Sequence, residues 1–144
     1  MEIILRLMVA AGLAADAYVH WVFAPDMASV AGGAVRGDDL FRAQAVVAVI
    51  AAALVLAWPR RWTYAIASLV AASALGAVLF YYYADPGAIG PLPSMHEPVW
   101  YGEKTISALG EGAAALAALA GLLTVGRRRA VPGHETAGGT RTSD

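Results

Sequence analysis

Residues 62–83 read WTYAIASLVAASALGAVLFYYY and contain no charged side chain. A helix needs about 20 mostly apolar residues to cross the hydrocarbon core of a membrane. This stretch meets that requirement, and it ends in three tyrosines, a residue type that favours the membrane–water interface. Residues 62–83 therefore predict a transmembrane helix, and the neighbouring stretches follow the same pattern.

Three more apolar stretches cover residues 3–23, 40–58 and 103–125 of the 144-residue chain. Hydrophobic residues make up 59% of the sequence, against about 45–50% in an ordinary soluble domain. We therefore expect an all-α, polytopic membrane protein in which residues 1–126 form an antiparallel four-helix transmembrane bundle within the lipid bilayer. Residues 127–144 are rich in Arg, Gly, Thr and Ser and predict a disordered cytoplasmic tail.

The basic residues predict how the bundle is oriented. Two tryptophans enclose a short basic turn at residues 58–62, and most other arginines fall on the same side of the predicted membrane. Because cytoplasmic segments carry an excess of Lys and Arg, we expect both termini in the cytoplasm and the protein in the cell membrane. The small residues 29–31 also fit a signal-peptidase site, but the length of the first apolar stretch favours a retained helix.

Several classes of function are excluded or lack a signal. The chain has no cysteine, which excludes thiol redox chemistry, disulfides and thiolate metal ligands. Its net charge of -1 gives no sign of a nucleic-acid partner. No phosphate-binding glycine loop and no nucleophile elbow occur. The sequence therefore contains no recognised catalytic motif, and it leaves open whether the protein is an enzyme.

Six polar residues in the outer half of the predicted spans form a candidate ligand or proton site. They are Asp16, His20, Arg42, Glu103, Ser107 and Glu111. A charge at membrane depth costs about 3 kcal/mol or more unless it is paired, so such residues face the interior of a bundle. Asp16 and His20 lie four residues apart on one helical face, and the fourth span repeats this spacing. Polar residues spaced in this way on the first and fourth spans predict an outward-facing polar pocket between them.

Four of these residues also have a purely structural interpretation. Asp16 and Arg42 would then form an ion pair between helices that only stabilises the bundle. His20 would be an anchor at the membrane interface. Glu111 would be a neutral acid that hydrogen-bonds across helices, since glycines 110 and 112 let a neighbouring helix approach it closely.

The outer loop contains a second candidate, the stretch Pro91-Leu92-Pro93-Ser94-Met95-His96-Glu97-Pro98. Its three prolines stiffen the backbone, so we expect the loop to fold down as a lid over the outer end of the bundle. The lid would carry Met95, His96 and Glu97 toward the polar pocket. Histidine and carboxylate together suit a divalent metal such as Zn²⁺. A solvated loop histidine is the alternative.

Particular strings of the sequence resemble known membrane proteins. Leu40-Phe41-Arg42-Ala43-Gln44-Ala45, Gly90-Pro91-Leu92-Pro93 and Glu97-Pro98-Val99-Trp100-Tyr101-Gly102-Glu103-Lys104 resemble a group of small, largely uncharacterised four-helix membrane proteins of actinobacteria. This resemblance covers residues 1–126 and implies the fold but no activity. More remotely, four short helices with a polar outer end resemble the DoxX-like membrane proteins, which implies a redox subunit that uses a quinone or haem.

Three functions remain open from the sequence. The leading one is a small integral membrane protein whose pocket binds a small ligand, a divalent metal ion or a proton. The second is a DoxX-like redox subunit with a quinone or haem. The third is a structural accessory subunit of a membrane complex, and a homo-oligomer fits any of the three.

Overall fold

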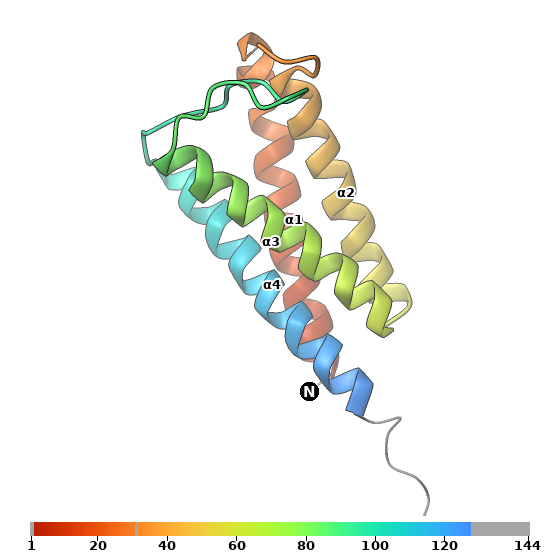
Figure 1. The fold of residues 1–144 in the computed structure, drawn as a ribbon. Helices are drawn as coiled ribbons and strands as arrows, with labels where there is room; N and C mark the ends of the chain where they lie inside the picture. The colour runs from red at the N-terminus through yellow and green to blue at the C-terminus, as the bar shows by residue number, and fades with distance from the viewer. Residues whose placement is uncertain (1, 31, 128–144) are drawn as a thin grey trace, which may run out of the picture.

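The computed structural model describes residues 2–30 and 32–127, which form four long helices (Figure 1). The helices are α1 (Glu2–Phe23), α2 (Gly37–Ala57), α3 (Arg61–Tyr83) and α4 (Gly102–Arg127). Each of them is long and apolar enough to cross a membrane. The prediction of an all-α chain with four such helices is therefore confirmed. The tail predicted for residues 127–144 lies outside the described residues from residue 128 onward.

The first turn of α2 begins earlier than its apolar content predicts. The helix begins at Gly37, three residues before the expected start at residue 40, and its first turn contains Asp38 and Asp39. Acidic side chains stabilise the N-terminus of a helix because the helix dipole is positive there. A short 3₁₀ helix, η1 (Pro25–Ser29), precedes this turn. Hydrophobicity alone cannot locate such a polar helix start.

Helices α1 and α4 approach each other closely where two glycines meet. A methyl group added to Gly12 would overlap the carbonyl oxygen of Gly110 and lie 2.8 Å from the Cβ of Ala114. Small residues of this kind let the backbones of two membrane helices come together. Asp16 follows Gly12 by one helical turn, and Glu111 directly follows Gly110. The close approach therefore positions the two acids near each other.

Helices α2 and α3 share the smallest of the four helix–helix interfaces among the described residues. Both helices contact the hydrophobic core, α2 from Ala45 to Val55 and α3 from Tyr64 to Ala71, and Val55 and Tyr64 are fully buried beside the short connection. Near the same end, the guanidinium group of Arg6 in α1 donates a hydrogen bond to the carbonyl oxygen of Leu56. The core is thus well packed at this end of the bundle.

The two long connections, residues 24–36 and 84–101, lie together at the other end of the bundle (Figure 1). The backbone N–H of Val35 donates to the carbonyl oxygen of Pro91 at 3.0 Å. The backbone N–H of Glu97 donates to the carbonyl oxygen of Tyr81, at the end of α3, at 3.2 Å. These hydrogen bonds hold the second connection against the first connection and against α3.

Candidate functional site

A cavity of about 310 Å³ lies between α2 and α3 in the half of the bundle nearest the long connections. Its walls are mostly apolar and aromatic, and they include Phe23, Phe41 and Tyr81. A few polar side chains complete the lining, among them His20 from α1 and Ser107 from α4. Small-molecule sites typically combine apolar walls with a small number of convergent polar groups. The cavity has this composition.

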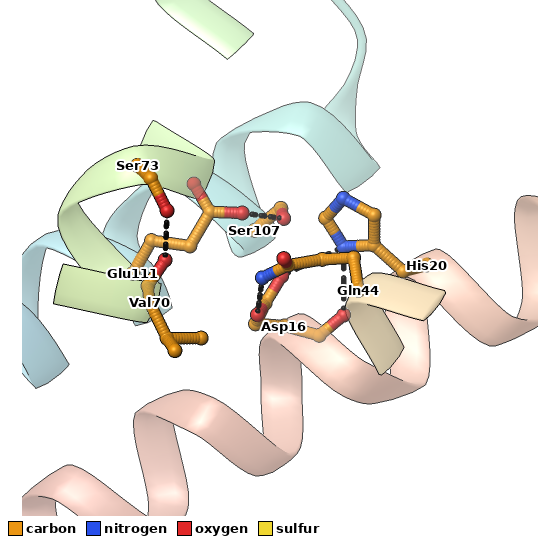
Figure 2. A network of polar contacts seen from close by, with 7 residues as sticks. All are labelled: Asp16, His20, Gln44, Val70, Ser73, Ser107 and Glu111. Carbon is orange, nitrogen blue, oxygen red and sulfur yellow. Dashed lines mark hydrogen bonds and ion pairs between the residues drawn. The ribbon is translucent and has the colours of Figure 1, made fainter. Parts of the chain in front are cut away.

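Polar side chains from α1, α2 and α4 form a cluster (Figure 2), and His20 and Ser107 of this cluster also line the cavity. The Nδ1 atom of His20 lies 2.7 Å from Oδ1 of Asp16. The amide of Gln44 in α2 donates a hydrogen bond to Oδ2 of Asp16 at 2.8 Å. The hydroxyl of Ser107 donates to Oε1 of Glu111 at 2.6 Å. We call Asp16, His20 and Glu111 the acid–histidine cluster, and one ligand atom from each lies within 4.8 Å of the other two.

The two acids of this cluster are fully buried, because Asp16 and Glu111 are each 0% exposed. Within the described part of the chain, Oδ1 of Asp16 and Oε2 of Glu111 receive no hydrogen bond. His20 is near the first of these oxygens, but its ring nitrogen makes its hydrogen bond with the backbone carbonyl of Asp16 at 3.0 Å. Buried polar atoms nearly always have a partner. These two oxygens are therefore able to accept a proton or bind a cation.

The structure brings together four of the six residues expected at the site. These are Asp16, His20, Ser107 and Glu111. Arg42 does not pair with Asp16 as expected, because Asp38 lies one turn before it on the same helix and accepts its hydrogen bond at 3.2 Å. Glu103 is exposed in the first turn of α4, where a carboxylate stabilises the helix N-terminus. Arg42 and Glu103 therefore lie outside the acid–histidine cluster.

The loop expected to act as a lid does contribute to the cavity. Met95 and Glu97 line it, and Glu97 pairs with Lys104 at 3.2 Å. His96 is not part of the lining, because its Nδ1 atom hydrogen-bonds to the carbonyl oxygen of Tyr81 at 2.8 Å. Among the described residues, the geometry of a metal site is found in the acid–histidine cluster and not in this loop.

Tyr101 also lines the cavity, at the point where the loop meets α4. Its hydroxyl donates to Oε2 of Glu97 at 3.4 Å, and the ammonium group of Lys104 lies 4.8 Å from the centre of its ring. Burial, reinforced by the negative charge of Glu97, raises the pKa of Tyr101 to about 12. The phenol is therefore neutral at physiological pH and acts there as a hydrogen-bond donor.

Sequence reasoning missed Gln44 and Lys104 as members of the site. Gln44 carries the one side-chain amide of the whole sequence, and Lys104 is the one lysine. A side-chain amide within a membrane span usually hydrogen-bonds to another helix, so the isolated glutamine was a usable signal. No such signal pointed to Lys104, because its partner Glu97 is brought to it by the path of the loop.

The chemistry available at this site is that of carboxyl, imidazole, amide and hydroxyl groups. These groups can orient a polar ligand through hydrogen bonds, hold or pass a proton, or bind a divalent cation. The sequence has no cysteine, so the site offers no thiol. Comparisons of the chain with protein-family models, curated proteins and solved structures found no match, so the geometry of the site carries the functional argument.

Proposed function

We propose that the protein binds a small, mostly apolar ligand in the cavity between α2 and α3. The polar group of the ligand is directed toward His20, Gln44 and Ser107. In this proposal the chain is a multi-pass protein of the cell membrane, an antiparallel four-helix transmembrane bundle with both termini in the cytoplasm. The excess of arginine on one side of the four spans supports this orientation, which places the cavity in the outer half of the bundle.

The observation that carries the proposal is the position of the polar cluster at the edge of a cavity. Ligand sites have volumes of about 300–1,000 Å³, and this cavity of about 310 Å³ suits a small ligand. An ion pair that only stabilised the bundle would be expected within packed side chains. Here His20 and Ser107 contact the acids on one side and line the cavity on the other.

Filling the cavity tests this proposal. Ala77 and Ala72 are both exposed residues of α3, but only Ala77 lines the cavity. We expect native mass spectrometry of the gently purified wild type to detect a small ligand at up to one copy per chain. Ala77→Phe should lose this ligand, and Ala72→Phe should keep it. Equal ligand content in all three proteins would contradict the proposal.

Cysteine labelling tests the orientation. The natural chain has no cysteine, so single variants give a clean signal. A thiol at the exposed position Ser94, in the loop over the cavity, should react with an impermeant reagent added to intact cells. A thiol introduced by Thr136→Cys should react only after the cells are opened. Labelling of the Thr136→Cys variant in intact cells would reverse the proposed topology.

A quinone is one ligand of the class that this cavity admits, since its ring fits aromatic walls such as Tyr81 and Tyr82 and its oxygens accept hydrogen bonds. The redox function implied by the DoxX-like resemblance therefore remains a second proposal. Absorbance of a quinone or haem in the purified protein would favour it. An accessory subunit would instead co-purify with partner proteins and tolerate Asp16→Ala and Glu111→Ala without loss of function.

A further inference from the structure

We propose that Asp16, His20 and Glu111 bind one divalent transition-metal ion of the zinc type. The inference rests on the proposed ligand site, because the ion would lie at the polar edge of the same cavity. The sequence left two places open for a divalent metal, the polar pocket and the loop residues Met95, His96 and Glu97. The structure gathers the metal-type ligands in the pocket, on α1 and α4.

The geometry of the cluster is close to that of a metal site. Three atoms that all lie within 4.8 Å of one another fit within about 2.8 Å of a common centre. Zinc bonds to imidazole nitrogen and carboxylate oxygen are about 2.0–2.2 Å long. Side-chain movements of about 0.8 Å are therefore enough to bring all three atoms to bonding distance. Rotation about the side-chain bonds of an aspartate or a glutamate supplies such a movement without moving a helix.

The donor set indicates which ions fit. One imidazole and two carboxylates suit zinc and its neighbours in the first transition series, whereas calcium takes six to eight oxygen ligands. Three protein ligands also leave a fourth position of a tetrahedral zinc ion for water or another molecule. Since His20 lines the cavity, that position is within reach of a ligand bound there.

Charge balance supports a cation at this place. Asp16 and Glu111 would carry two negative charges in a fully buried environment, and unpaired charge at membrane depth is strongly unfavourable. In the described ranges, Arg42 is engaged with Asp38 and Lys104 with Glu97, and His20, when protonated, would neutralise only one of the two acids. A divalent ion would neutralise both acids at once.

One oxygen of each acid is held by a hydrogen bond, and the other receives none. Gln44 holds Oδ2 of Asp16 and leaves Oδ1 without a hydrogen bond. Ser107 holds Oε1 of Glu111 and leaves Oε2 without one. Metal-binding carboxylates are typically oriented in this way by partners that do not touch the metal. Gln44 and Ser107 therefore act as positioning residues for the proposed ion.

Metal binding by the full-length protein in lipid nanodiscs tests this inference. After treatment with a chelator, the wild type should bind one Zn²⁺ per chain, and Co²⁺ in its place should give a visible absorption band. Asp16→Asn and Glu111→Gln should weaken binding by at least about 100-fold, and Ser107→Ala by about 10–100-fold. The control variants Asp39→Asn and Glu103→Gln make the same chemical changes at exposed acids, in α2 and α4. They should bind Zn²⁺ like the wild type.

X-ray absorption of the zinc-loaded wild type gives a test that does not depend on the folding of variants. It should show nitrogen and oxygen donors with an imidazole contribution. The inference would be overturned if the wild type did not bind Zn²⁺ stoichiometrically, or if Glu111→Gln bound it as well as the wild type does. Protons would then neutralise the two acids. Ala77→Phe separates the two proposals, because it should lose the organic ligand and keep Zn²⁺. Zinc failing to bind while the organic ligand is retained would refute only the metal site.

Discussion

The α1–α4 side of the bundle and the α2–α3 side differ in how closely their helices pack. On the first side Gly12 and Gly110 bring two backbones together, and on the second side the helices enclose a cavity of about 310 Å³. The acid–histidine cluster lies on the closely packed side, whereas Gln44 reaches it from α2. Close packing thus fixes the acids in place, and looser packing leaves a cavity beside them.

The largest effect is expected from adding a methyl group on the closely packed side. Gly12→Ala should destabilise the protein by about 1–3 kcal/mol, because the new methyl group overlaps Gly110. Gly76→Ala, on α3, has no neighbouring atom within 4 Å of the added methyl group. It should be neutral or stabilise by up to about 1 kcal/mol, since alanine favours a helix over glycine. Thermal unfolding in detergent measures both, and equal effects would show that α1 and α4 do not pack as described.

A second prediction concerns the hydrogen bond that joins the two sides, from Gln44 to Asp16. A double-mutant cycle with Gln44→Leu and Asp16→Ala, each of which removes the hydrogen bond, should give a coupling energy of about 0.6 kcal/mol, and at most about 1.7 kcal/mol. Such values are typical of hydrogen bonds between membrane helices. The free energies of unfolding of the two single variants and the double variant provide the measurement. Additive effects would indicate that Gln44 does not contact Asp16.

A smaller effect is expected for the pair at the start of α2, Arg42 and Asp38. The side chain of Arg42 is 48% exposed, and exposed ion pairs contribute about 0–1 kcal/mol. Arg42→Gln should therefore change stability by less than Asp16→Asn does, and it should leave ligand and metal content unchanged. Loss of the ligand in this variant would show that Arg42 belongs to the binding site, as the sequence predicted.

The smallest effect is confined to alkaline pH. The pKa of Tyr101 is raised to about 12, above the value of about 10 for a tyrosine in an unfolded chain. The contribution of Tyr101 to stability is therefore complete below pH 10 and is lost as the pH rises toward 12. Ultraviolet absorbance of the wild type minus that of Tyr101→Phe isolates this ionisation. A midpoint near 10 would show that the phenol is not buried at the rim.

Most of the fold was predictable because a helix long and apolar enough to span a membrane is recognisable from composition. The charge-free stretch at residues 62–83 corresponds to α3 within one residue. The start of α2 was not predictable from hydrophobicity, because Asp38 and Asp39 lie in its first turn. The placement of η1 depends on contacts with the start of α2, which a single apolar pattern does not encode.

The site was predictable to the extent that helical spacing determines it. Spacing by four residues paired Asp16 with His20 and Ser107 with Glu111, and the structure contains both contacts. Arg42 and its partner were not predictable, because two acids competed for one guanidinium group and only the true helix start decides between them. The position of His96 likewise depends on a backbone hydrogen bond within an irregular loop.

Thiol accessibility tests the central claim, that an open cavity reaches the polar cluster, most directly. Ser107 and Ala117 are both buried residues of α4, but only Ser107 lines the cavity. We expect a small, uncharged thiol reagent to modify Ser107→Cys in ligand-depleted protein and to leave Ala117→Cys unmodified on the same time scale. Equal protection of the two cysteines would contradict the account, because it would mean that no cavity connects the acid–histidine cluster to the outside.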